Sequence, residues 1–125
     1  MILDTNAISA WADGQEEFLK VLPAAHVLAF PVIGVGEYLW GLRRSRRREP
    51  LEEWLWRTLP LGLTLSITVG TARHYATIRE SLQRKGRPIP QNDQWIAALA
   101  LEHQMPVLSR DTDFDYVDGV ERISW

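Results

Sequence analysis

The stretch Met1-Ile2-Leu3-Asp4-Thr5-Asn6 decides the fold. Its first three residues are apolar and three polar residues follow directly, which is typical of a short buried strand with polar side chains at its carboxyl end. In an open sheet of parallel strands, ligands bind beyond the carboxyl ends of the strands. Asp4 is therefore a candidate functional residue, and acids that follow other strands are candidates to join it.

Apolar strands and helical segments alternate along the rest of the chain. Further strands are predicted at 27–30, 63–67, 106–109 and 120–123. Helices are predicted in pieces over 9–22, from Gly34 onward, over 50–56, over 68–85, and after an N-cap at Asn92. This alternation predicts a three-layer α/β/α fold with a central, mainly parallel sheet. The 125 residues carry no repeat or linker, so we expect a single domain over 1–125.

The composition excludes several classes of site. The chain has no cysteine, which removes disulfides, thiolate metal sites and cysteine nucleophiles. The longest apolar stretch, Val27 to Val35, is interrupted by Pro31 and Gly34 and is far shorter than the ~20 residues that span a bilayer. No signal peptide is recognisable at the start. We therefore expect a cytoplasmic protein with no membrane association.

Four acids occupy equivalent places in this pattern. Asp4 follows the first strand, and Asp111 follows the strand that ends at Ser109. Glu37 lies in the first turns of the helix after the second strand. Asp93 lies in the first turn of a later helix, where its charge suits the helix dipole. If the sheet is parallel, all four lie at one edge.

Carboxylates held so close together repel one another unless a cation cancels their charge. Ligation by oxygen alone favours Mg²⁺ or Mn²⁺ over zinc, and the three histidines lie outside the acidic motifs. A metal in such a site can activate water and stabilise charge on a phosphodiester. Taken singly, each acid could also be a helix cap, a turn residue or a solvated side chain. The joint pattern is what favours a metal-dependent hydrolase.

Four segments together resemble PIN domains, and within them the VapC-type toxins of prokaryotic toxin–antitoxin pairs. They are Ile2-Leu3-Asp4-Thr5-Asn6, Glu37-Tyr38-Leu39-Trp40-Gly41, Asn92-Asp93-Gln94-Trp95-Ile96-Ala97-Ala98 and Leu108-Ser109-Arg110-Asp111-Thr112-Asp113-Phe114. Each segment is a weak signal alone. Their order, spacing and placement on the predicted elements make the resemblance specific over essentially the whole chain.

The resemblance implies a metal-dependent endoribonuclease that is the toxin of a type II toxin–antitoxin system. It implies catalytic and metal-binding roles for Asp4, Glu37, Asp93 and Asp111, with Asp113 assisting at the metal. It implies that three polar residues orient the first acid or a water at the metal: Thr5, Asn6 and Ser109. One departure is the pair of glycines before Glu37, Gly34 and Gly36, which leaves the aim of Glu37 open.

A run of arginines follows the helix of Glu37. It comprises Arg43, Arg44, Arg46, Arg47 and Arg48. The run begins six residues after Glu37, about 9 Å along a helix, which is close enough to contact the phosphates of an RNA substrate. We expect the run to continue the helix, with Arg43 and Arg47 on one face. The alternative is a solvated helix end, where cations also suit the dipole.

Three of the six tryptophans, Trp40, Trp54 and Trp56, cluster in the region after the second strand. Core packing is the default for any one of them, but tryptophan is also enriched at interface hot spots. The resemblance implies that this region forms a groove for an antitoxin peptide and lies near a homodimer contact.

Other α/β proteins fit the sequence less well. A haloacid-dehalogenase phosphatase needs a second aspartate at Asn6, and a dinucleotide-binding motif needs a third glycine after Gly34-Val35-Gly36. A response-regulator receiver needs paired acids at the first strand. The serious rival is a catalytically silent PIN-like module that binds RNA or protein, although a silent domain has no need of a repulsive acidic cluster.

Overall fold

Five short parallel strands form the centre of the computed structural model, which describes residues 1–125. Their order across the sheet is β3-β2-β1-β4-β5, so the first strand of the chain lies in the middle. The strands are β1 (Ile2–Leu3), β2 (Ala29–Pro31), β3 (Leu63–Leu65), β4 (Val107–Leu108) and β5 (Arg122–Ile123). The predicted strands are confirmed, each shorter than the apolar run that indicated it, and every pairing is parallel.

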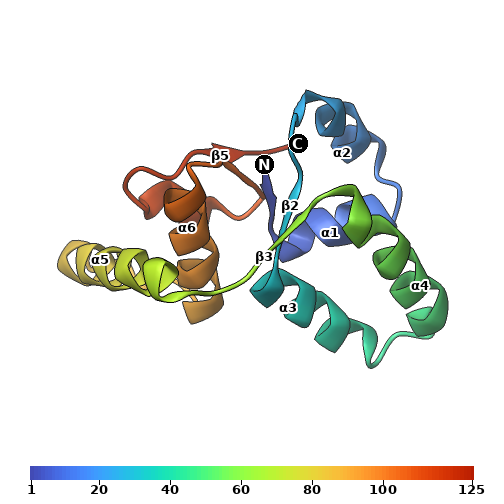
Figure 1. The fold of residues 1–125 in the computed structure, drawn as a ribbon, viewed down its shortest axis with the longest axis horizontal. Coiled ribbons are helices and arrows are strands. Elements are labelled where there is room, and N and C mark those ends of the chain that lie inside the picture. Colours follow the sequence, from blue (N-terminus) through green and yellow to red (C-terminus); the bar gives the residue numbers. More distant parts are fainter.

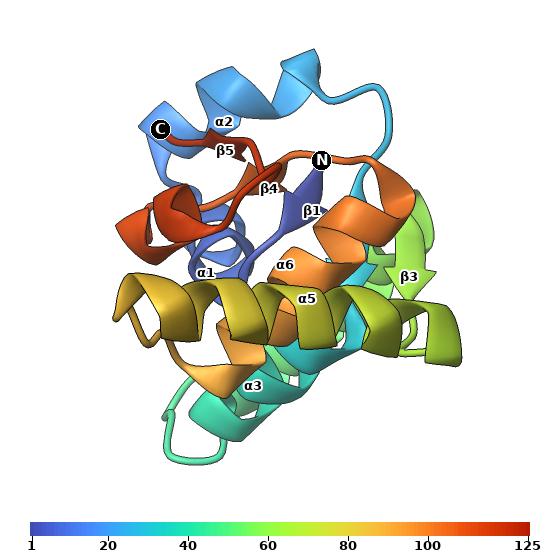
Figure 2. The same cartoon turned by 90° about the vertical axis from the view of Figure 1, so that its left-hand side faces the viewer.

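Helices cover both faces of the sheet, which confirms the three-layer α/β/α fold (Figure 1). On one side lie α1 (Thr5–Ala12), α2 (Glu16–Val21), α3 (Val32–Leu42) and α4 (Arg48–Thr58). On the other side lie α5 (Val69–Lys85) and α6 (Gln91–His103), with α5 crossing over α6 (Figure 2). Short 3-10 helices occupy Leu22–Ala24, Leu59–Leu61 and Thr112–Tyr116. No helix has the length and apolarity that a membrane crossing requires.

The alternation of side chains along the strands builds two cores. Ile2 and Val107 belong to the cluster beneath α5 and α6. Leu3, Phe30 and Leu108 belong to the cluster beneath α1 to α4. Successive side chains of a strand point to opposite faces of the sheet, so the three central strands β1, β2 and β4 contribute to both cores. Because a strand buried on both faces needs apolar residues on both, its sequence is a continuous apolar run. These runs are what made the strands predictable from the sequence.

Two sequence predictions about helices are wrong. Asn92 does not cap α6, because the helix begins at Gln91 with Pro90 at the N-cap position. The arginine run does not extend α3, which ends at Leu42. Instead the Ser45 hydroxyl accepts a hydrogen bond from the Arg47 backbone N–H (3.1 Å), a local turn that competes with helix.

Candidate metal centre

Asp4 is the most deeply placed acid of the predicted set. It follows β1 and caps α1, and its Oδ1 accepts a hydrogen bond from the Thr5 backbone N–H at 2.8 Å. Its Oδ2 accepts hydrogen bonds from the Ser109 hydroxyl (2.7 Å) and the Asn6 amide (2.9 Å). Burial nevertheless raises the pKa of Asp4 above its ordinary value, because desolvation disfavours the charged form more than these bonds favour it.

Ser109 and Asn6 join the end of β4 to the start of α1. The Asn6 amide donates a hydrogen bond to the Ser109 hydroxyl oxygen (3.0 Å), which also accepts one from the Asp111 backbone N–H (2.9 Å). The Arg110 backbone N–H in turn donates to the side-chain Oδ1 of Asn6 (3.2 Å). The polar residues around Asp4 therefore fix its carboxylate relative to the backbone of Asp111.

Three acids come together around the neighbouring strand end. Carboxylate oxygens of Asp93, Asp111 and Asp113 all lie within 4.8 Å of one another, each side chain being only partly exposed. Asp111 caps the 3-10 helix Thr112–Tyr116, and its Oδ1 accepts a hydrogen bond from the Asp113 backbone N–H at 2.9 Å. Asp93 lies in the first turn of α6 and brings its carboxylate to those of Asp111 and Asp113. This spacing suits several oxygens around one cation.

Glu37 reaches the same edge of the sheet from α3. The Thr5 hydroxyl donates a hydrogen bond to Glu37 Oε1 at 3.3 Å. Gly34 lies one turn earlier in α3, where an added Cβ would be 3.2 Å from Pro31 Cγ and 3.6 Å from the Leu3 carbonyl oxygen. The absence of a side chain at Gly34 therefore lets α3 pass close to the end of β1. The two glycines do not disorder the start of this helix.

Electrostatics tie the five acids into one cluster. The pKa of Asp93 is raised to about 7, first by burial and then by the charges of the four other carboxylates: Asp4, Asp111, Glu37 and Asp113. None of the five forms an ion pair with a lysine, arginine or histidine, although seven other acids do. No lysine, arginine or histidine therefore pairs directly with the cluster, although the charge of Arg122 interacts with that of Asp111.

The donor set fits a hard divalent cation. All of its ligating atoms are carboxylate or hydroxyl oxygens, the type that Mg²⁺ and Mn²⁺ prefer. His103 lies in the last turn of α6, at the opposite end from Asp93, and its imidazole contacts Glu102. The residues present could therefore hold such a cation without a nitrogen or sulfur ligand.

Two of the five arginines of the run form ion pairs and three do not. Arg47 Nη1 lies 3.6 Å from Asp13 Oδ1, and Arg48 Nε lies 2.9 Å from Glu52 Oε1. The other three arginines are exposed and have no ion pair: Arg43, Arg44 and Arg46. Only these three are free to contact an anionic ligand without first breaking an ion pair.

Two of the three tryptophans are exposed and the third is packed inward. Trp40 on α3 and Trp56 on α4 are 70% and 55% exposed. Trp54 instead packs inward, its ring edge-on to Trp11 (centroids 5.7 Å apart) and to Tyr38 (6.2 Å). Trp54 is thus part of the packing around α1, α3 and α4, and Trp40 and Trp56 are the two that a partner could reach.

Sequence reasoning missed Arg122, which supports the site from β5. Its Nε and Nη2 donate to the two carboxylate oxygens of Asp115 (2.8 and 2.9 Å), and its Nη1 donates to the Ser109 carbonyl (3.2 Å). The guanidinium thereby ties the 3-10 helix Thr112–Tyr116 to the end of β4. A lone arginine in an acidic segment gives no signal of this role in the sequence.

Comparisons with known proteins agree with this geometry. The family model described as PIN domain matches residues 1–120. Toxin FitB of Neisseria gonorrhoeae is 31% identical over 129 residues, which cover 90% of this chain and 88% of FitB. Ribonuclease VapC5 of Mycobacterium tuberculosis is 38% identical over 60 residues, which cover 48% of this chain. That match spans only 44% of VapC5's own length.

Solved structures show the same fold. The structure of FitAcB from Neisseria gonorrhoeae matches with a TM-score of 0.86 and 30% identity, covering 98% of this chain and 95% of that one. The structure of VapBC2 from Rickettsia felis, bound to a DNA fragment from its promoter, matches with a TM-score of 0.88. There the identity is 20%, and 99% of this chain and 97% of that one are covered.

Proposed function

This chain belongs to the PIN domain family, and we propose that it is a metal-dependent endoribonuclease, the toxin of a type II toxin–antitoxin pair. The observation that supports this activity most directly is the cluster of five acids, without a cationic ion-pair partner, at the carboxyl edge of the sheet. Two relatives bear the name ribonuclease, VapC5 and VapC4 of Mycobacterium tuberculosis. The acidic cluster is the feature of this chain that would perform the corresponding chemistry.

The proposed ligands are Asp4, Glu37, Asp93 and Asp111, with Asp113 assisting. A Mg²⁺ or Mn²⁺ ion held there would supply Lewis-acid activation of water and of the scissile phosphate. Asp4 is oriented for this by the Ser109 hydroxyl and the Asn6 amide, and Glu37 by the Thr5 hydroxyl. Such fixed geometry matters because phosphodiester cleavage depends mainly on positioning and charge stabilisation.

We propose that the RNA backbone contacts the loop between α3 and α4. The three unpaired arginines of that loop, Arg43, Arg44 and Arg46, are exposed and follow the helix that carries Glu37. Arg47 could join them, since its contact with Asp13 is long and exposed, and exposed pairs contribute little. Cationic side chains near the acids would offset the repulsion that the cluster exerts on phosphates.

We propose an antitoxin as the protein partner, and a homodimer as the assembly. Solved neighbours are VapBC and FitAB toxin–antitoxin complexes, which motivates the first part. The rings of Trp40 on α3 and Trp56 on α4 are exposed, and tryptophan is enriched among the residues that dominate protein interfaces. Trp54 would support this part of the surface from beneath.

The test is RNA cleavage by the purified chain. We expect total RNA to be cut in the presence of Mg²⁺ or Mn²⁺, and chelator or Asp4→Asn to abolish cutting. Glu53→Gln removes an exposed acid of α4 and serves as the control that should cut normally. Cleavage that survives both chelator and Asp4→Asn would contradict the proposal, and tight RNA binding without any cleavage would support a silent binding module instead.

A further inference from the structure

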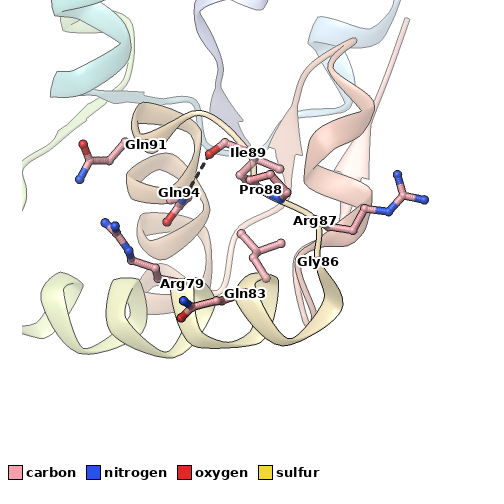
Figure 3. Close-up of a pocket in the computed structure, with 9 residues that line it drawn as sticks. Arg79, Gln83, Gly86, Arg87, Pro88, Ile89, Gln91 and Gln94 are labelled. Carbon is pink, nitrogen blue, oxygen red and sulfur yellow. Dashed lines mark hydrogen bonds between the residues drawn. The ribbon is translucent and has the colours of Figure 1, made fainter.

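A pocket of about 500 Å³ lies between the C-terminal half of α5 and the start of α6 (Figure 3). The loop that joins the two helices closes one side of it. Leu82, Pro88 and Ile89 give it apolar walls, and three glutamine side chains contribute amides: Gln83, Gln91 and Gln94. The pocket therefore combines flat apolar surface with groups that can each donate and accept hydrogen bonds.

Gln94 is the buried polar group of this pocket. Its side chain is only 8% exposed, and its Nε2 donates a hydrogen bond to the Ile89 carbonyl at 3.0 Å. Its Oε1 is buried and has no hydrogen-bond partner. Figure 3 shows this oxygen turned away from Ile89 and towards α5. A buried acceptor without a donor is costly for the fold, so a ligand that supplies an N–H there would be favoured.

The pocket adjoins the acidic cluster. Gln94 directly follows Asp93 in the first turn of α6, so their Cα atoms are about 3.8 Å apart. Successive residues of a helix point about 100° apart, and here Asp93 lies with Asp111 and Asp113 while Gln94 lines the pocket beside α5. A strand bound at the acids therefore has the pocket beside it, across the first turn of α6.

The charge of the pocket suits a polyanion. No carboxylate lines it, and the guanidinium of Arg79 lies beside it, whereas the Arg87 side chain extends away from it (Figure 3). Neither is in an ion pair: Arg79 donates to the Tyr75 hydroxyl (2.7 Å), and Arg87 lies 4.4 Å from the centroid of the Tyr116 ring. Arg84 differs, because it is paired with Glu80 and does not line the pocket.

We propose that this pocket receives one base of the RNA strand next to the bond that is cut. The inference rests on the proposed ribonuclease function and adds a specificity site to it. Every RNA base has an N–H donor beside an acceptor on its edge, which would match Gln94 Oε1 and the donors of Gln91 or Arg79. Proteins bind single-stranded RNA in this way, with bases splayed out, stacked on planar groups and hydrogen-bonded at their edges.

The first test needs no cleavage. The ¹⁵N-labelled protein is titrated in EDTA with the four nucleoside 5′-monophosphates and with ribose 5-phosphate. We expect at least one nucleotide to shift the Gln94 side-chain amide and the Ile89 backbone amide saturably, and ribose 5-phosphate to leave them unchanged. Equal shifts with ribose 5-phosphate would reveal an anion site only, and no shift at all, or a shift that follows protein concentration, would overturn the inference.

The second test maps the cut. An RNA with a randomised segment is digested, and the new ends are sequenced. We expect the wild-type chain to prefer particular bases at a position beside the cut, and Gln94→Met to reduce that preference by about tenfold. Arg79→Gln should weaken it as well, with Arg84→Gln as the matched control on the same helix. Thermal unfolding confirms that each variant is folded.

Together the two tests distinguish a failure of the base pocket from a failure of the proposed ribonuclease function. Cleavage with a preference that ignores Gln94 and Arg79 would overturn the base pocket and leave the ribonuclease intact. Base-dependent shifts in a chain that never cuts RNA would contradict the ribonuclease and support the pocket. Loss of all cutting in Gln94→Met is resolved by Arg79→Gln, which must still change the preference if the inference is correct.

Discussion

Asp93 has four other carboxylates as neighbours and no cation to balance them. Its pKa is raised to about 7 from an ordinary value of 3.8. The folded protein therefore holds this proton at pH values where the unfolded chain has lost it. Without metal, the free energy of unfolding should consequently fall as the pH rises from about 4 to about 7, because the native state binds the extra proton over that range.

Replacing Asp93 by Asn should remove this penalty. In EDTA at pH 7.5 we expect Asp93→Asn to unfold at a higher temperature than the wild-type chain, since each 1 kcal/mol raises the Tm of such a domain by about 4 °C. At pH 5 the difference should shrink, because Asp93 is then already neutral. Differential scanning calorimetry measures both.

Adding metal to the wild-type chain and to Asp93→Asn gives a complementary test. Saturating Mg²⁺ or Mn²⁺ should raise the Tm of the wild-type chain by mass action and that of Asp93→Asn much less. A wild-type Tm that is independent of both pH and metal would show that the five acids do not repel one another as described.

Residues differ in how readily sequence reveals them. Asp4, Asp93 and Asp111 could be predicted because each stands at a strand end or a helix start, where a parallel sheet brings chain-distant positions together. Glu37 lies in the middle of α3 and reaches the same edge because α3 passes close to the end of β1. Gln94 and Arg122 could not be predicted, because their importance depends on what packs against them: Ile89 above one, and Asp115 and the Ser109 carbonyl beside the other. No periodicity encodes such contacts.

At the scale of elements, α3 shows why two similar glycines can have different roles. An added Cβ at Gly34 meets Pro31 and the Leu3 carbonyl, whereas one at Gly36 meets nothing within 4 Å. From the sequence, both glycines left the orientation of Glu37 open. The structure assigns the close approach to Gly34 alone and leaves Gly36 as an exposed interior position of α3.

The two glycines can be tested as a pair. Gly36→Ala should stabilise the protein by about 1 kcal/mol, because alanine favours helix without needing space. Gly34→Val should destabilise it by about 1–3 kcal/mol through overpacking, and should weaken metal binding by moving Glu37 from Thr5. Urea unfolding and Mn²⁺ titration report the two effects. Equal tolerance of both changes would contradict the close approach.

The loop between α3 and α4 is the element that sequence predicted least well. A helical face was expected for the arginines, but the Ser45 hydroxyl and the mutual repulsion of neighbouring cations favour a turn. Periodicity cannot anticipate this, since arginine alone is a good helix former. The charge of the segment was predictable, and its geometry was not.

For the loop we predict a change in salt dependence. Replacing Arg43, Arg44 and Arg46 by Gln should weaken RNA binding at low salt and reduce the slope of log K against log salt by about 2, at roughly 0.7 per lost contact with single-stranded RNA. Arg57, Arg73 and Arg84 are exposed arginines elsewhere and give a control triple of equal charge. Identical slopes for the two triples would show that the loop does not touch RNA.

At the scale of the whole molecule, Trp40 on α3 and Trp56 on α4 leave two large apolar rings exposed to solvent. Replacing Trp40 and Trp56 by Ala should weaken binding of the cognate antitoxin by about 30-fold or more, as loss of an interface hot spot does. Val69 is 85% exposed at the start of α5, on the other side of the sheet, so Val69→Ala is the control. Calorimetric titration measures the affinities, and similar values for the two variants would place the antitoxin elsewhere.

The strand order β3-β2-β1-β4-β5 has a consequence for synthesis on the ribosome. β1 emerges early, yet one of its two neighbours, β4, comes from residues 107 and 108. Asp111 and Asp113 emerge later still, so a nascent chain that stops before them holds only three of the five acids and has its central strand half paired. The growing polypeptide would therefore be harmless to the message being translated, and the proposed activity would begin only once its final elements are free to fold.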